Sequence, residues 1–275
     1  MATAWNPSEH GTPLGSGAQP GDSIPWYLWC AVLAVTSVSI GAHWDVSWHR
    51  SIGRDSFWTP AHMAIYACGV LAAISCGYLV LHTTFRKPPA MVASSVEIFG
   101  LRAPLGAFIA SWGGVAMLTS APFDNWWHNA YGLDVKIVSP PHTLLMLGVF
   151  SVSVGTLIML LGAMNRATDG SIRRHLQWLM LYVGGLMVVA LFGAIVFRLL
   201  RAAQIARDPL GRLLCAGALA LLAYSAIQNV GMTIGLIPIA GIPLPFVSYG
   251  GSAMIVFFAT VGLVVNVELR RSIRR

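Results

Sequence analysis

Apolar residues fill most of the chain in stretches of about twenty positions, and charged residues, proline or glycine separate one stretch from the next. A helix of that length can cross the hydrocarbon core of a bilayer. The pattern therefore predicts an all-α fold, a polytopic integral membrane helical bundle with about seven transmembrane helices. The predicted helices are residues 26–43, 61–82, 103–120, 142–164, 176–200, 211–236 and 252–267.

Two segments outside these helices differ in character. Residues 1–25 are rich in Gly, Pro and Ser and lack the basic and apolar regions of a signal peptide, so we expect a flexible tail. Residues 237–246 are rich in proline and cannot form the interior of a helix. Irregular backbone at membrane depth must be buried in protein or line a cavity, so this stretch predicts a re-entrant loop.

Composition narrows the class further. The 275 residues are 56% hydrophobic and 10% charged, whereas soluble domains are about 25% charged. This favours a membrane protein without a separate soluble domain. The net charge of +7 comes from basic residues beside apolar runs, which is typical of cytoplasmic loops rather than of a nucleic-acid interface. We expect membrane lipids, and no nucleic acid, as partners. Four cysteines in apolar segments, without a C-x-x-C pair, are predicted to be buried: Cys30, Cys68, Cys76 and Cys215.

The basic residues give conflicting predictions of topology. When seven helices alternate across a membrane, those near residues 86–87 and 166–174 fall on one side, and those near 201–212 and at the C-terminus fall on the other. Basic loops favour the cytoplasm. Either one basic loop is tolerated outside, or two modules of separate origin meet near residues 185–200, with segment 176–200 failing to cross. The second interpretation predicts a metal-binding module over 26–185 and another module over 186–275.

A duplicated motif lies in the two loops predicted at residues 44–60 and 121–140. The first copy reads Asp45-x-x-Trp48-His49-x3-Gly53-x-Asp55 and continues with Pro60-x-His62. The second copy reads Asp124-x-x-Trp127-His128-x3-Gly132-x-Asp134 and continues with Pro140-Pro141-His142. Identities at matched spacing indicate a shared chemical role.

Metal binding is the chemistry that best fits this motif. Residues four apart on a helix share one face, so Asp45 and His49 can point the same way. The break at Pro60 lets a second helix begin, and His62 can then face back toward them. Asp124, His128 and His142 repeat the set. Two histidines and a carboxylate suit copper, iron(II) or zinc.

Simpler interpretations of these residues remain open. The same side chains could form a buried polar network that joins the helices, and the tryptophans nearby are typical of an interfacial belt. Asp55 and Asp134 could accept hydrogen bonds from ligand imidazoles or pair with Arg54 and Lys136. His43 could add a ligand or stand alone at the interface.

The stretch from Asp45 to His62 resembles one of the three kinds of subunit in the copper membrane monooxygenases, the family of particulate methane and ammonia monooxygenases. The resemblance covers roughly residues 26–165. In that family an Asp-x3-His-x12-His set binds copper, which implies Asp45, His49 and His62 as ligands. A second family set, Asn-x3-His-x13-His, implies His128 and His142, with Asp124 in place of the asparagine. The resemblance implies copper as the metal and other membrane subunits as partners.

From about Arg201 the sequence resembles the SEDS family of bacterial shape, elongation, division and sporulation proteins. The resemblance is carried by Arg207-Asp208-Pro209-Leu210-Gly211-Arg212 and by the stretch from Asn229 through Pro245-Phe246-Val247-Ser248-Tyr249-Gly250-Gly251-Ser252. It implies an inner-membrane location and, as a partner, the lipid-linked cell-wall precursor that such glycosyltransferases polymerise. Amides at the start of a helix can receive a diphosphate, so a lipid-diphosphate loop is predicted at Ser248, Gly250, Gly251 and Ser252. A plain structural hairpin is the alternative.

Three functions remain open from the sequence. The protein is a metal-binding, redox-capable membrane subunit, a SEDS-type cell-wall protein of elongation or division, or a non-catalytic fusion of the two. The family's large extracellular loop with its catalytic aspartate has no counterpart here, so we do not expect glycan polymerisation by this chain alone.

Overall fold

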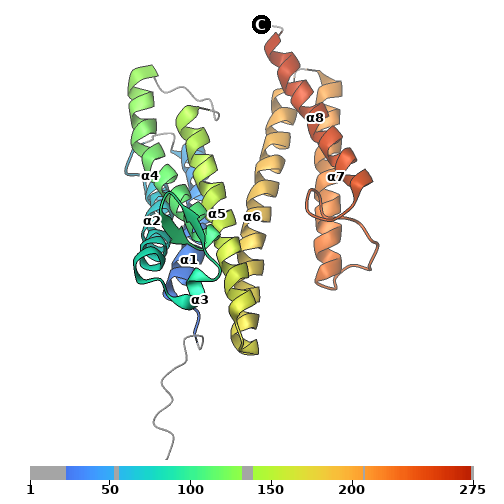
Figure 1. Ribbon diagram of the computed structural model, residues 1–275. Coiled ribbons are helices and arrows are strands. Elements are labelled where there is room, and N and C mark those ends of the chain that lie inside the picture. The colour runs from blue at the N-terminus through green and yellow to red at the C-terminus, as the bar shows by residue number, and fades with distance from the viewer. Residues whose placement is uncertain (1–22, 53–55, 132–138, 207, 274–275) are drawn as a thin grey trace, which may run out of the picture. The chain divides into compact units, whose positions relative to one another are not determined.

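The computed structural model describes residues 23–52, 56–131, 139–206 and 208–273. Seven helices in these ranges are long and apolar enough to cross a membrane (Figure 1), which confirms the all-α polytopic fold. They are α1 (Trp26–Ser51), α2 (Pro60–Arg86), α4 (Leu105–Tyr131), α5 (Pro140–Arg166), α6 (Gly170–Ile205), α7 (Pro209–Thr233) and α8 (Gly251–Ile273). A short α3 (Pro89–Val92) and an antiparallel hairpin of β1 (Val96–Ile98) and β2 (Leu101–Ala103) lie between α2 and α4.

Three helices begin in the same way, with a capping side chain followed by proline. Thr59, Ser139 and Asp208 each accept a hydrogen bond from the amide three residues later. Proline at the first helical position removes a donor that would otherwise have no partner. Each Ser, Thr or Asp before proline therefore marks a helix start.

Two helices are longer than the sequence predicts. Residues 44–60 and 121–140 are predicted to be loops, but α1 continues to Ser51 and α4 continues to Tyr131 through an internal Pro122. Polar residues in the last turns lower the hydropathy there without ending the helix. The Asp and His residues of both motif copies consequently lie on helix ends.

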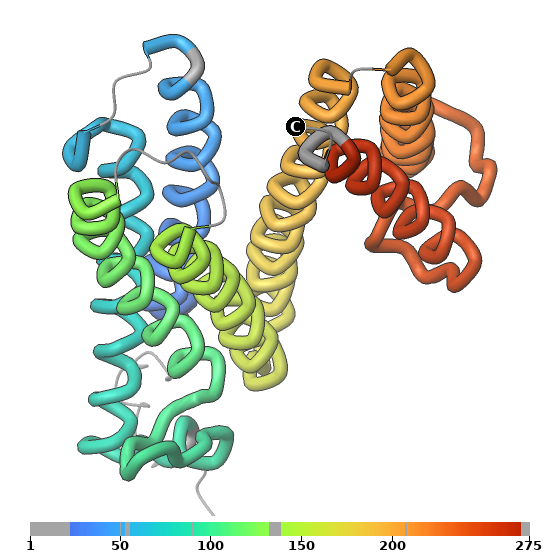
Figure 2. The backbone as a smooth tube through the Cα atoms, turned by 90° about the horizontal axis from the view of Figure 1, so that it is seen from above, coloured from blue at the N-terminus to red at the C-terminus, as the bar shows by residue number. Residues whose placement is uncertain are grey.

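The chain divides into two compact units, residues 1–186 and 187–275. The predicted module boundary after residue 185 lies beside this division. In the first unit α1 packs on α2, α2 on α4, α4 on α5 and α5 on α1. Since successive helices of this bundle run in opposite directions, the turns that follow α1 and α4 lie at one end. Figure 2 shows α3 and the hairpin at the other end.

In the second unit, α7, α8 and the C-terminal part of α6 enclose a smaller core that includes Leu199, Leu222 and Phe257. Residues 234–250 between α7 and α8 contain no helix, as the proline content predicted. Two side chains hold this loop: the Asn229 amide donates to the Ile242 carbonyl (2.8 Å), and the Ser248 hydroxyl accepts from the Leu244 amide (2.9 Å). Its depth in the bilayer remains a prediction.

Candidate functional sites

The end of α1 and the start of α2 bring three predicted ligands together. Oδ1 of Asp45 lies 3.6 Å from Nε2 of His49 and 3.3 Å from Nε2 of His62. One donor atom from each of the three residues lies within 4.8 Å of the other two. The i,i+4 spacing on α1 and the helix start at Pro60 therefore produce the cluster that the sequence predicted.

The geometry of this first cluster fits a metal ion. Oδ1 of Asp45 is buried and has no hydrogen-bond partner among the described residues. Two ligands bound at about 2.1 Å to a tetrahedral ion lie about 3.4 Å apart, close to both separations from Asp45. The other nitrogen of His62, Nδ1, lies 3.0 Å from the Ser56 carbonyl. Such a contact fixes the tautomer in which Nε2 carries the lone pair that binds a metal.

The end of α4 and the start of α5 form a second cluster from the second motif copy. Nε2 of His128 lies 3.3 Å from Oδ2 of Asp124, while Nδ1 of His142 lies 3.7 Å from Oδ1. As in the first cluster, Oδ1 is buried without a hydrogen-bond partner among the described residues. The two histidines approach different oxygens of the carboxylate, so the donors are more spread out than in the first cluster.

The helix cap explains this difference. Nδ1 of His142 lies 2.6 Å from the hydroxyl of Ser139, the residue that caps α5. Thr59 occupies the matching position before His62, but there Nδ1 of the ring lies against the Ser56 carbonyl. The sequence motif did not include Ser139, although a hydroxyl three residues before each histidine in a Ser/Thr-Pro pair was a visible signal.

Close helix contact positions both clusters. A side chain added at Gly41, one turn before Asp45, would lie 2.9 Å from the backbone nitrogen of Ile65 on α2. A side chain at Gly113 on α4 would lie 2.7 Å from the Gly148 carbonyl on α5. Small residues let helix backbones approach in this way, and the approach lets ligands from two helices meet.

Other residues singled out from the sequence are not brought into these clusters. His43 is exposed on α1, where its Nδ1 lies 2.7 Å from the Ser39 carbonyl, one turn earlier. Asp55 and Asp134 lie outside the described residues, so their roles remain predictions. Cys68, Cys76 and Cys215 are buried as predicted, while Cys30 is partly exposed.

A third candidate site lies along the loop between α7 and α8. A hollow of about 430 Å³ is lined by polar groups of Asn229, Thr233 and Ser248 and by apolar residues that include Ile239 and Tyr249. Helix α8 begins at Gly251, beside Ser248 and Tyr249. A side chain at Gly250 would contact only Ala253, at 3.7 Å, and one at Gly251 would meet open space. Backbone amides there can thus be approached closely.

Comparison with known proteins assigns the second unit. Residues 180–273 match the family model described as Cell cycle protein. The chain is 43% identical over 88 residues to the probable peptidoglycan glycosyltransferase FtsW of Geobacter metallireducens, covering 32% of this chain and 24% of that protein. It is 39% identical over 89 residues to the peptidoglycan glycosyltransferase MrdB of Escherichia coli K12, covering 32% and 24%. No solved structure matches the chain.

A longer alignment reaches beyond the second unit. Stage V sporulation protein E of Bacillus subtilis is 28% identical over 164 residues, covering 57% of this chain and 45% of that protein. An alignment of this coverage includes residues of the first unit as well. The family match also begins at residue 180, within α6, rather than near Arg201, where the sequence resemblance was placed.

These matches confirm the resemblance of the C-terminal third to the SEDS family, while the resemblance of residues 26–165 to the copper monooxygenases stays a prediction. With seven apolar helices, they describe a multi-pass protein of the bacterial inner membrane. The chain spans between about a quarter and just under half of the length of these relatives.

Proposed function

We propose that the second unit binds a lipid-linked cell-wall precursor at the loop between α7 and α8. The family match over residues 180–273 carries this proposal, because the relatives' names describe peptidoglycan glycosyltransferases. The hollow at this loop supports it. Polar groups of Asn229, Thr233 and Ser248 line the hollow, and the amides at the start of α8 suit a diphosphate.

Polymerisation by this chain alone is not expected. After residue 176 the sequence contains two acidic residues, Asp208 and Glu268. Asp208 caps α7 by accepting from the Gly211 amide (2.8 Å), and Glu268 lies 3.4 Å from Nη1 of Arg198. The sequence suggested neighbouring arginines as partners, but the helix cap and Arg198 take that role. Both carboxylates have structural contacts away from the hollow.

Binding of labelled lipid-linked disaccharide-pentapeptide to the detergent-purified chain tests this proposal. We expect binding without formation of a glycan polymer, and at least a tenfold loss of binding in G250L, because the new side chain would obstruct the amides of α8. G262L is the matched control, since a side chain at Gly262 on α8 also meets open space. Equal binding by both variants would contradict the proposal. Polymer formed by a D208N/E268Q variant would contradict the expected lack of catalysis.

A second function is proposed for the first unit, the binding of a metal ion at each Asp/His cluster. The buried Oδ1 atoms of Asp45 and Asp124 without hydrogen-bond partners among the described residues support it. A cation there would compensate each carboxylate. Of the metals that suit this donor set, copper is proposed because of the resemblance to the copper monooxygenases, which also suggests a role as a redox subunit beside other membrane subunits.

Metal analysis of protein loaded with copper, iron or zinc tests this second function. We expect about two ions per chain in the wild type and about one in H49A or in H128A, because loss of a ligand is local. H82A is the control, since His82 stacks on Tyr78 in α2 with ring centroids 5.5 Å apart. Equal metal content in the wild type and the H49A/H128A double variant would exclude metal binding by these clusters.

A further inference from the structure

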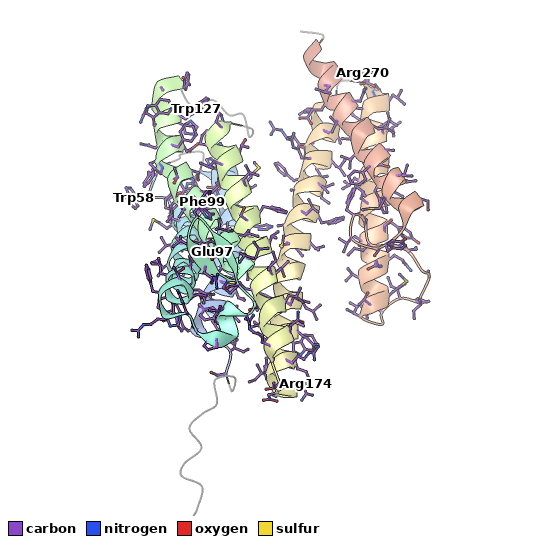
Figure 3. All side chains as sticks on the ribbon, viewed as in Figure 1. Trp58, Glu97, Phe99, Trp127, Arg174 and Arg270 are labelled. Carbon is purple, nitrogen blue, oxygen red and sulfur yellow. The ribbon has the colours of Figure 1, made fainter. Side chains whose placement is uncertain are left out.

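The hairpin between α2 and α4 exposes an aromatic residue in a strained conformation. Phe99 and Gly100 form its two-residue turn, and both have positive φ, 52° and 78°. Glycine or asparagine usually fills such positions because a larger residue there is unfavourable. The Phe99 side chain is nevertheless 95% exposed (Figure 3), so no packing within the described residues of this chain compensates the strain. Strain retained without internal benefit points to an external role.

The level of the hairpin along the bundle suggests what Phe99 meets. The hairpin follows a candidate membrane span, α2, and directly precedes another, α4. It therefore lies where the chain leaves the hydrocarbon core. Phe85, in the last turn of α2, is also largely exposed, at 77%. Aromatic side chains at this level commonly enter the headgroup region of the bilayer.

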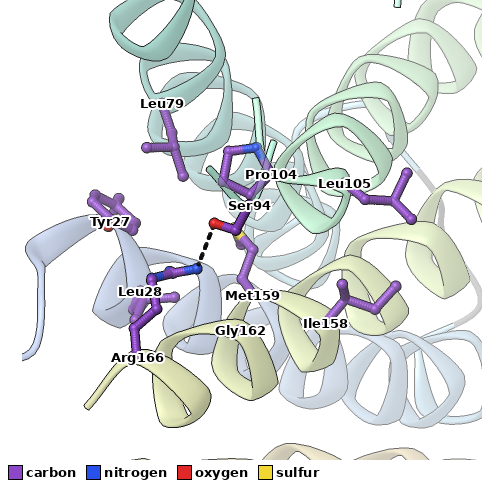
Figure 4. A pocket seen from close by; sticks show the side chains of 10 residues that line it. All are labelled: Tyr27, Leu28, Leu79, Ser94, Pro104, Leu105, Ile158, Met159, Gly162 and Arg166. Carbon is purple, nitrogen blue, oxygen red and sulfur yellow. Dashed lines mark hydrogen bonds between the residues drawn. The ribbon is translucent and has the colours of Figure 1, made fainter. Parts of the chain in front are cut away.

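Basic side chains surround the same loop. Arg86 and Lys87 follow at the end of α2 and are both exposed. Arg166, at the end of α5, donates from Nη1 to the hydroxyl of Ser94 in the loop, at 3.1 Å (Figure 4). By contrast, Arg102 in β2 is neutralised by Glu97, 2.6 Å away. Among the described residues, the charges without a carboxylate partner at this end are thus on Arg86, Lys87 and Arg166.

A small cavity lies beneath Arg166. It has a volume of about 130 Å³ and is lined by polar groups of Tyr27, Ser94 and Arg166 and by apolar side chains such as Leu79 and Met159 (Figure 4). A polar rim with a cationic group over an apolar floor suits an amphipathic anion. A phospholipid combines those two properties.

We propose that this end of the first unit is a binding surface for anionic phospholipid. Phe99 enters the headgroup region, Arg86 and Lys87 attract lipid phosphates, and Arg166 with Ser94 holds one headgroup at the rim of the cavity. The ligand is the lipid rather than a free phosphate, because the exposed Phe99 and the apolar floor need an apolar partner. This surface lies at the end of the bundle opposite both Asp/His clusters and is independent of the functions proposed above.

The charge contribution is tested by counting lipids retained by the detergent-purified full chain in native mass spectrometry. We expect preference for phosphatidylglycerol over phosphatidylcholine, and at least a tenfold weaker preference in the R86Q/K87Q/R166Q variant, since each basic residue near an anionic surface contributes about fivefold. R201Q, which removes one exposed arginine from α6, is the matched control for R166Q. R86Q/K87Q leaves the Ser94 contact intact and covers the case in which R166Q misfolds.

Two results would overturn the proposal. The first is a charge variant that retains phosphatidylglycerol as well as R201Q does. The second is displacement of the lipid by inorganic phosphate at equal concentration, which would indicate a free-anion site. The aromatic contribution is tested with F99W in vesicles of lipids brominated near the headgroup. Extra tryptophan emission that these lipids quench is expected, and extra emission that they do not quench would show that residue 99 stays in water.

Discussion

At the residue scale, the contact between α4 and α5 depends on single glycines. A side chain at Gly155 would lie 2.6 Å from the Ala110 backbone nitrogen and 2.6 Å from the Gly106 carbonyl. Backbone atoms cannot rotate away, so the two helices must separate. A side chain at Gly162, two turns later on α5, would meet only the guanidinium of Arg166, at 3.4 Å.

These two glycines give a matched prediction. Overpacking costs about 1–3 kcal/mol, so G155A should lower the free energy of unfolding by about 2 kcal/mol and lower the thermal midpoint of helical circular dichroism in detergent. G162A should be neutral or slightly stabilising, because alanine favours a helix over glycine by about 1 kcal/mol. Because the same contact aligns Asp124 with His142, G155A should also weaken metal binding at the second cluster. Similar midpoints for the two variants would show that this helix contact is loose.

The ligand sets show how much of a site a sequence can predict. Spacing alone predicted that Asp45, His49 and His62 meet, because i,i+4 positions share a helix face and a proline begins the next helix. It could not predict that Ser139 contacts His142 or that the Ser56 carbonyl contacts His62, since both depend on the exact path of a turn. First contacts of a helical motif are thus readable, while the groups that orient the ligands require coordinates.

At the element scale, hydropathy found every long helix in the described residues but not every helix end. Polar residues in the last turns of α1 and α4 made these turns look like loops, whereas the Ser/Thr/Asp-Pro pairs marked the starts of α2, α5 and α7. The hairpin of β1 and β2 was missed because three-residue strands leave almost no alternating pattern. Its turn of Phe99 and Gly100 departs from the usual Asn-Gly signal.

Helix α6 explains how basic residues can occur at both ends of one span. Its 36 residues form a continuous helix, about 54 Å long at 1.5 Å per residue. The hydrocarbon core is about 30 Å thick. Arg173 and Arg201 can therefore both reach the headgroup regions on opposite sides. A single continuous helix with a highly apolar centre argues for a regular crossing by segment 176–200.

At the scale of the whole molecule, seven crossings fix which segments share a side of the membrane. The turn between α1 and α2, the turn between α4 and α5, the turn between α6 and α7 and the C-terminus then all lie on one side. More of the chain's Lys and Arg residues lie on this side than on the other, which favours the cytoplasm. The loop between α7 and α8 then faces outward.

Reporter tags at those four positions test this arrangement. We expect all four to report the cytoplasm, with a tag in the loop between α7 and α8 reporting the outside. This outcome would place the proposed precursor-binding loop at the outer surface and both Asp/His clusters near the cytoplasmic surface. If the charge rule instead governed each unit separately, tags between α1 and α2 and between α4 and α5 would report the outside while the C-terminus reported the cytoplasm. That result would mean that α6 does not cross, because an odd number of crossings could no longer connect the two halves.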